Sequence, residues 1–303
     1  MRRWVLSLSL GLSLGLCVSA SQAQVPPDIA TKVKASAGKI DFSVAAMYGP
    51  LQPKEPYKGV DVTRDLAYGP DPLQKLDVFS PQAKSAKPRP VLLFVHGGGF
   101  VRGDKKTTDN MLVWGAWNGM VGVDIDYRLA PKDPWPAGAQ DLKAAIAWTR
   151  ANIAKYGGDP DRIIIWGHSA GANHVADYVG HSELQGPEAA GVKGAIIMSA
   201  FYGAQVGAQP NPYYGSDASL QTSDASIARM VKTKIPLYVI NAEYDPEGFI
   251  AYETALDAAL TKAGIAHGRL VAKDHGHLDE GLAVGTDDHG VTGPLLEWLK
   301  GVE

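Results

Sequence analysis

Short strands with no polar face alternate with helical segments through most of this 303-residue chain. Strands that are apolar on both sides are typical of a parallel sheet covered on both faces, and the intervening helices make the crossover connections. The predicted strands are 76–79, 91–95, 120–125, 162–166, 195–198, 237–240 and, more weakly, 269–272. The predicted helices are 138–156, 172–179, 250–263 and 294–302. This alternation predicts an α/β protein with a mostly parallel central sheet and helices on both faces.

The organisation of the chain favours one large domain. No internal repeat and no linker is found after residue 24, so residues 61–303 are expected to fold as a unit. Residues 24–60 contain five prolines around a weakly helical stretch, which predicts an N-terminal arm laid over that domain. With 29 basic and 32 acidic residues, the chain has no positive surplus for phosphates, and we expect no nucleic-acid partner. The sequence does not indicate an oligomeric state.

Residues 1–23 have the pattern of a secretory signal peptide. Arg2 and Arg3 precede an apolar run over 4–18, and small residues follow that run. Ser21-Gln22-Ala23 fits a signal-peptidase site, and Val18-Ser19-Ala20 fits one three residues earlier. We therefore expect an exported protein, periplasmic or secreted, with its N-terminus at Gln24 or Ser21.

Two other interpretations of this segment involve the membrane. The segment is an uncleaved anchor helix in one of them, although its apolar core is short. In the other, Cys17 carries a lipid, but Leu16 is larger than the residue that usually precedes a lipidated cysteine. No later segment approaches the roughly 18 apolar residues of a membrane span, so we expect no stable membrane insertion. Cleavage would remove the only cysteine and exclude cysteine chemistry from the mature protein.

The sequence Gly167-His168-Ser169-Ala170-Gly171 lies between a predicted strand and a predicted helix. In this strand–turn–helix context, a G-x-S-x-G pattern holds a serine on a turn too tight for flanking side chains, so its hydroxyl projects above the sheet edge. The helix N-terminus also directs free N–H groups toward a negative oxygen formed nearby. Such a pattern arises by chance in a glycine-rich chain, but its position indicates that Ser169 is a nucleophile.

A second glycine-rich segment, His96-Gly97-Gly98-Gly99-Phe100, follows the predicted strand 91–95. Consecutive glycines let the backbone approach a ligand with its N–H groups free, as an oxyanion hole requires. A phosphate-binding loop is the alternative, because Gly98 and Gly103 have the G-x-x-x-x-G spacing. Asp104 occupies the position of the required lysine and would repel a phosphate. The segment therefore favours an oxyanion hole.

A nucleophilic serine needs a histidine base, and the best candidates follow the last predicted strand. His275 and His277 both lie directly after 269–272. His277 is favoured because Gly276 frees the backbone just ahead of it, and His275 remains the alternative. A zinc site built on both histidines lacks an evident third ligand.

The acid that orients the base is expected after another strand, between the serine and the histidine. Asp245 follows the predicted strand 237–240 and is held by Pro246 before the next helix. Glu243 is the runner-up. Capping of the following helix is an alternative role for Asp245.

These segments resemble the α/β-hydrolase carboxylesterases, of the hormone-sensitive-lipase and feruloyl-esterase-like kind. The resemblance is carried by His96–Phe100, by Asp126-Tyr127-Arg128-Leu129-Ala130-Pro131, by Trp166–Ala172, by Tyr244-Asp245-Pro246 and by a passage running from His277 through Leu278 and Glu280 to Gly285, Thr286 and Leu295. It covers roughly residues 60–300 and implies the α/β-hydrolase fold. It also implies a triad of Ser169, Asp245 and His277, and oxyanion donors at the N–H groups of Gly98, Gly99 and Ala170.

Several aromatic residues near these loops are candidates for the substrate pocket, with core packing as the alternative for each. They are Phe100, Trp135, Tyr202 and Tyr214, together with Phe201 and Tyr213. The expected protein is an exported serine esterase that hydrolyses small carboxylic esters through an acyl-enzyme and needs no metal or organic cofactor. A serine peptidase of the same fold and a catalytically silent binding module are the alternatives. The sequence does not identify the ester.

Overall fold

The computed structural model describes residues 25–203, 205–206 and 209–302. The predicted signal peptide lies outside these residues. None of the helices in the described part is long and apolar enough to cross a membrane.

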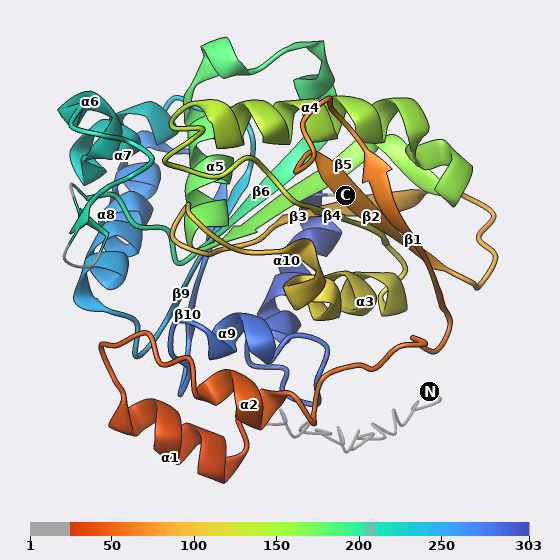
Figure 1. Cartoon of the computed structure of the whole chain (residues 1–303), viewed down its shortest axis with the longest axis horizontal. Helices are drawn as coiled ribbons and strands as arrows, with labels where there is room; N and C mark the ends of the chain where they lie inside the picture. The colour runs from red at the N-terminus through yellow and green to blue at the C-terminus, as the bar shows by residue number, and fades with distance from the viewer. Residues whose placement is uncertain (1–24, 204, 207–208, 303) are drawn as a thin grey trace, which may run out of the picture.

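An eight-stranded sheet crosses the molecule in the order β1-β2-β4-β3-β5-β6-β9-β10 (Figure 1). The first two pairings, β1 with β2 and β2 with β4, are antiparallel, and all the others are parallel. This confirms the mostly parallel sheet predicted from the sequence. The strands are β1 Val60–Ala67, β2 Lys75–Pro81, β3 Arg89–Val95, β4 Val121–Ile125, β5 Gly158–His168, β6 Val192–Met198, β9 Leu237–Ala242 and β10 His267–Ala272.

Helices cover both faces of this sheet (Figure 1). Side chains of α4 (Ala137–Asn152), α5 (Ala170–Gly180) and α8 (Glu247–Ala263) form one core with the sheet. Those of α3 (Asp109–Trp117) and α10 (Thr292–Val302) form a second core on the opposite face. Because successive strand residues point to opposite faces, Leu93 belongs to the first core and its neighbour Leu92 to the second. The central strands are therefore apolar throughout.

Shorter elements complete the described chain. They are α1 Pro27–Ala35, α2 Val44–Tyr48, η1 Lys105–Thr108, η2 Ile153–Tyr156, η3 Ser182–Leu184, η4 Pro187–Gly191, β7 Gln205–Val206, β8 Gln209–Pro210, α6 Ala218–Gln221, α7 Ser223–Met230 and α9 Asp279–Leu282. The predicted helix over 138–156 is divided between α4 and η2, and the one over 250–263 begins three residues earlier.

The N-terminal segment contains two helices, α1 and α2, of which α2 lies beside α9 and α1 beside α2 (Figure 1). Ile29, Val33, Val44 and Tyr48 are buried in a small apolar cluster with Ala283, which follows α9. The weakly helical stretch expected within 24–60 is therefore two helices packed against the segment that follows β10. This packing places the arm next to the sheet edge that carries the candidate catalytic residues.

Candidate active site

Ser169 lies on a sharp turn between β5 and α5, with φ 54° and ψ −124°. A side chain on either flanking glycine would collide with backbone atoms. A Cβ on Gly167 would lie 2.2 Å from the carbonyl oxygen of Gly171, and one on Gly171 would lie 2.0 Å from that of Val95. The left-handed φ of a serine costs energy, so the turn persists because its surroundings leave no other path. The serine is thereby held above the carboxyl edge of the sheet.

Two hydrogen bonds connect Ser169 to His277 and Asp245. The Ser169 hydroxyl lies 2.9 Å from His277 Nε2, and His277 Nδ1 lies 2.8 Å from Asp245 Oδ1. A carboxylate can only accept, so the ring proton belongs on Nδ1 and leaves Nε2 as the acceptor for the serine proton. His277 and Asp245 are both buried, which shields these bonds from water. The three side chains thus have the geometry of a nucleophile, a base and an orienting acid.

Asp245 is held by two further donors. Its Oδ2 accepts the backbone N–H of Ala242 at 2.9 Å and the hydroxyl of Ser199 at 2.6 Å. Ser199 is fully buried directly after β6 and has a left-handed φ of 51°. The carboxylate of Asp245 is therefore held toward His277, and neither of its oxygens caps α8. Ser199 was not among the predicted site residues, although a polar residue directly after a buried strand is the same signal that singled out Asp245.

The alternative base and acid lie away from the serine. His275 is buried with its Nε2 3.4 Å from Asp288, and its Nδ1 faces the carbonyl oxygen of Lys273 at 3.0 Å. Glu243 accepts the backbone N–H of Asp274 at 2.9 Å at the protein surface. The structure therefore brings His277 and Asp245 to Ser169, whereas in the described chain His275 and Glu243 make no hydrogen bond to any of the three.

The loop between β10 and α9, residues 273–278, carries His277 and is called the base loop below. The turn that carries Ser169, residues 167–171, is called the elbow. Its His168 binds the base loop, because His168 Nε2 lies 2.8 Å from the carbonyl oxygen of His277. That Nε2 therefore bears a proton, and burial lowers the pKa of His168, which favours its neutral form. Glu280, fully buried, lies 3.5 Å from the same nitrogen, and burial raises the pKa of its carboxyl well above the usual value. A neutral His168 thus fastens the elbow to the base loop.

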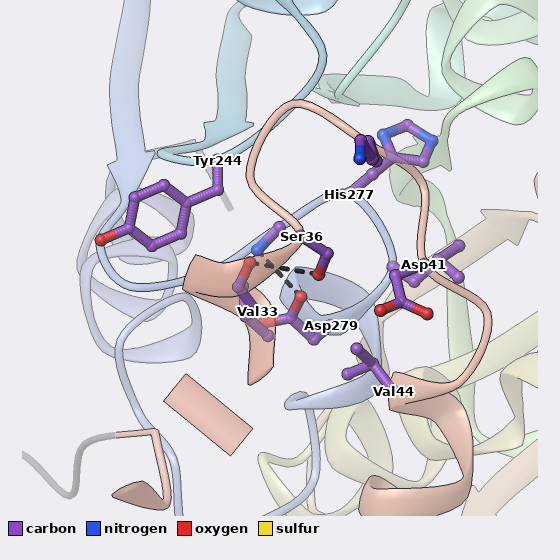
Figure 2. A pocket seen from close by; sticks show the side chains of 10 residues that line it. Val33, Ser36, Asp41, Val44, Tyr244, His277 and Asp279 are labelled. Carbon is purple, nitrogen blue, oxygen red and sulfur yellow. Dashed lines mark hydrogen bonds between the residues drawn. The ribbon is translucent and has the colours of Figure 1, made fainter. Parts of the chain in front are cut away.

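The arm supports the base loop from the other side. Figure 2 shows Val33, Ser36 and Val44 of the arm around a small cavity that Asp279 and His277 also line. A Cβ on Gly276 would lie 3.3 Å from Val33, so the arm packs closely against the loop backbone. The N–H of Gly38 in the arm donates to the carbonyl oxygen of Tyr244 at 3.0 Å, one residue before Asp245.

One group of side chains has the spacing of a metal site. Ligand atoms of His168, His277 and Glu280 lie within 4.8 Å of one another. Both ring nitrogens of His277 are already bonded, to Ser169 and to Asp245. A metal at this place would have to break one of those bonds, so the donor set does not fit a catalytic metal. His275, the other histidine weighed for zinc, is not in this group.

The glycine-rich segment after β3 lies opposite the serine. Gly98, Gly99 and Phe100 all have left-handed φ values, of 132°, 61° and 70°. Within the described chain, the N–H groups of Gly98 and Gly99 donate to no backbone carbonyl oxygen. Ala170, the first residue of α5, lies on the same cleft as these glycines. The three residues predicted as oxyanion donors therefore line the same cleft as Ser169.

A cleft of about 480 Å³ opens onto Ser169, and its lining is largely apolar. Phe100 lines it, as does Phe201, whereas Trp135, Tyr202, Tyr213 and Tyr214 do not. Several apolar lining residues were not among the sequence candidates: Ile40, Phe42 and Ala45 of the arm, Met111 of α3, Phe249 of α8, and Leu278 and Leu282 around α9. The arm and α9 thus form a wall of the cleft, which no local sequence signal around the motifs could indicate.

The tyrosines expected in the pocket are instead bonded to a buried carboxyl. The hydroxyls of Tyr202 and Tyr214 donate to the two oxygens of Asp177 at 3.0 and 2.8 Å. Trp135 packs near His181, with ring centroids 5.3 Å apart. Placing Tyr202, Tyr214 and Trp135 in the pocket was therefore a wrong prediction, because bonding and core packing hold them away from the cleft.

Burial raises the pKa of Asp177 from 3.8 to about 7. The folded protein then keeps a proton that the unfolded chain loses near pH 4, so unfolding releases a proton between about pH 4 and 7. Stability from this group consequently falls as pH rises through that window and levels off above it. Asp177→Asn has no titrating carboxyl and should not lose this stability as pH rises.

We therefore expect the free energy of unfolding of Asp177→Asn, relative to that of wild type, to increase from pH 5 to pH 8 by on the order of 1–3 kcal/mol, measured by urea denaturation. A difference that does not change with pH would show that Asp177 is ionised throughout.

A model of the prolyl oligopeptidase family matches residues 135–302, which is more than half of the chain. The chain belongs to this family of α/β-hydrolases. A second model, described as BD-FAE, matches residues 76–189. The two matches overlap across the elbow, and together they extend from β2 to the end of α10.

Curated relatives of this α/β-hydrolase are esterases. The chain is 44% identical to esterase LipC of Mycobacterium tuberculosis over 111 residues, which are 36% of this chain and 28% of that protein. It is 30% identical to esterase LipQ of the same organism over 236 residues, 67% of this chain and 54% of that protein. These relatives confirm the predicted membership of the α/β-hydrolase carboxylesterases. The chain spans about a quarter to a half of the length of these two relatives.

Solved structures agree on the fold. A bacterial heroin esterase superposes with a TM-score of 0.68 at 23% identity, covering 92% of this chain and 98% of that one. A thermostable esterase from Pseudomonas putida superposes with the same TM-score at 20% identity, covering 92% and 98%. At this level of identity the likeness establishes the α/β-hydrolase fold alone.

Proposed function

We propose that this α/β-hydrolase is a serine carboxylic ester hydrolase with Ser169 as its nucleophile. The observation that carries the proposal is the pair of hydrogen bonds from Ser169 through His277 to Asp245, at 2.9 and 2.8 Å, at the floor of an apolar cleft. An apolar cleft suits the uncharged body of an ester. The esterase relatives support the same activity.

In the first half of the reaction, the Ser169 hydroxyl attacks the ester carbonyl carbon while His277 Nε2 takes the hydroxyl proton. Asp245 stabilises the imidazolium that forms, and it keeps the ring in the required tautomer. Negative charge moves to the carbonyl oxygen, where the N–H groups of Gly98, Gly99 and Ala170 can stabilise it. Preorganised donors of this kind each contribute about 10²–10³ in rate.

The tetrahedral intermediate then collapses, and the bond between the carbonyl carbon and the alcohol oxygen breaks. The proton on His277 goes to the departing alcohol, which leaves an ester between the acyl group and Ser169. In the second half, His277 takes a proton from a water molecule that attacks this acyl-enzyme. The bond between the acyl carbon and Ser169 Oγ then breaks, and His277 returns its proton to Oγ as the acid leaves.

A panel of 4-nitrophenyl esters of increasing acyl length, with methyl ferulate and an acetylated sugar beside them, tests this function. We expect release of 4-nitrophenol from at least the shorter esters, together with covalent labelling by an organophosphonate. Absence of hydrolysis across the whole panel by folded, labelled protein would contradict esterase activity.

Peptide hydrolysis is the second candidate, because the prolyl oligopeptidase model matches the half of the chain that holds the triad residues. Peptide 4-nitroanilides distinguish it from esterase activity. A kcat/KM for nitroanilides equal to or above that for the esters would favour the peptidase.

We also propose that the protein is exported, on the basis of the sequence of residues 1–23. Mass spectrometry of protein recovered from the periplasm or medium should give a mature N-terminus at Gln24, or at Ser21 if the earlier site is used. A soluble protein that retains Met1 would contradict export by this route.

A further inference from the structure

One charged side chain in the cleft is not explained by the reaction above. Among the described residues that line the cleft, Arg102 is the only lysine, arginine, aspartate or glutamate. Its side chain is exposed to solvent at the cleft, and no carboxylate of the described chain forms an ion pair with it. It therefore differs from Arg64 and Arg128, whose guanidinium groups bind aspartates elsewhere in the protein.

The other polar side chains of the lining are engaged within the protein. Thr107, Thr108, Asn110 and Asn173 each donate to a backbone carbonyl oxygen at 2.7–2.9 Å. The guanidinium of Arg102 instead lies over the ring of Phe42, 5.0 Å from its centroid. A guanidinium has five N–H donors, and an aromatic face occupies none of them. Apart from the reacting groups, Arg102 is therefore the donor that the cleft presents to a substrate.

The position of Arg102 is fixed by the turn that carries the oxyanion donors. Its carbonyl oxygen would lie 1.9 Å from a Cβ on Gly98, so the two backbones are in direct contact. Gly103, which follows it, has φ 127° and would place a Cβ 2.3 Å from His96 Nδ1. Both glycines are thus required for the turn, which holds Arg102 beside the oxyanion hole. Phe42 approaches from the arm and is 60% exposed.

We propose that Arg102, backed by Phe42, binds a carboxylate on the ester, so that the preferred substrates carry a free acid group on their acyl or alcohol part. This rests on the proposed esterase function. The planar guanidinium matches a carboxylate in two parallel hydrogen bonds, and the Phe42 ring excludes water from one of its faces. The apolar walls bind the body of the ester, and the cation selects its charged end.

Two pairs of esters, matched except for the acid group, test the proposal. The 4-nitrophenyl ester of pentanoic acid against the mono-4-nitrophenyl ester of glutaric acid probes the acyl part, since the second replaces a terminal methyl by a carboxylate. Phenyl acetate against 4-acetoxybenzoate probes the alcohol part. The readout is the ratio of kcat/KM for the charged ester to that for its neutral partner.

In at least one pair, we expect Arg102→Gln to lower this ratio by about tenfold while kcat/KM for the neutral ester changes little. Arg102→Lys should retain part of the preference, and Phe42→Leu should reduce it less than Arg102→Gln does. Lys106→Gln is the matched control, because Lys106 is an exposed cation four residues away that does not line the cleft. The wild-type ratio should also fall with added salt.

The outcomes separate this inference from the proposed function. If wild type hydrolyses the neutral esters but Arg102→Gln leaves both ratios unchanged, the carboxylate site is wrong and the esterase stands. The same conclusion follows if Lys106→Gln lowers a ratio as much as Arg102→Gln, because general charge attraction then explains the preference. If wild type hydrolyses none of the four esters, the proposed function itself fails.

Discussion

Ser169→Ala should lower kcat/KM for 4-nitrophenyl esters by about 10⁴–10⁶-fold, the loss typical when a nucleophile is removed from a catalytic triad. In the proposed mechanism the hydroxyl oxygen is the attacking atom, and its proton goes to the His277 nitrogen that lies 2.9 Å away. The residual rate would come from binding and from the oxyanion donors, which the substitution leaves in place. Labelling by an organophosphonate should disappear with the activity.

Ser85→Ala is the matched control, since Ser85 is an exposed loop serine whose hydroxyl bonds to the backbone of nearby Lys87. It should keep full activity and labelling. Circular dichroism and the urea midpoint of Ser169→Ala should match those of wild type, because alanine keeps the Cβ and its packing contacts in the turn. A folded Ser169→Ala protein with more than about a hundredth of the wild-type rate would be incompatible with the serine mechanism.

The parallel core of the fold was predictable from local sequence because its strands are buried on both faces. Segments such as 91–95 and 237–240 have no polar side, and few structures other than a covered parallel strand accommodate them. β1 and α3 were missed for opposite reasons. β1 is an edge strand that alternates apolar and charged residues, and α3 is buried almost all round, so it has no amphipathic stripe.

For the candidate site, the sequence identified side chains that follow strands, and the structure brings Ser169, Asp245 and His277 within hydrogen-bonding distance. Each lies after a parallel strand, and the carboxyl ends of such strands meet at one edge. The walls of the cleft could not be predicted in this way, because Phe42 is more than one hundred residues from Ser169 in the chain. Its place depends on how the arm packs on α9, which is a tertiary contact with no local pattern.

Aromatic residues near the motifs were also poor guides to the pocket. Tyr202 and Tyr214 are close to the elbow helix, but Asp177 of that helix accepts both of their hydroxyls in the core. Proximity along the chain could not distinguish a tyrosine bonded to a buried acid from one lining the cleft. The sequence does contain Asp177, but nothing local marks it as buried.

The second large loss of kcat/KM is expected from substitution of His277, and not of its neighbour His275. His277→Ala should lower kcat/KM about as far as Ser169→Ala, because residues of a triad act as a unit and removing the base removes the proton acceptor. His275→Ala should keep most of the activity, since the His275 ring faces Asp288 at 3.4 Å and makes no contact with Ser169. The substitution should lower stability instead, because the buried His275 ring would leave a cavity and its hydrogen bond to the carbonyl oxygen of Lys273 would be lost.

Urea denaturation and kcat/KM, measured on both variants, separate these effects. His277→Ala should be folded and inactive, whereas His275→Ala should be active and less stable by about 1–3 kcal/mol. The reverse activities in two folded variants would leave the serine mechanism standing and make His275 the base. That result would require the base loop to rearrange, because the carbonyl oxygen of His277 is bonded to His168 and its ring already joins Asp245 to Ser169. The two histidines are separated by one glycine, so the bonds of His168 and Asp245 decide which ring faces the nucleophile.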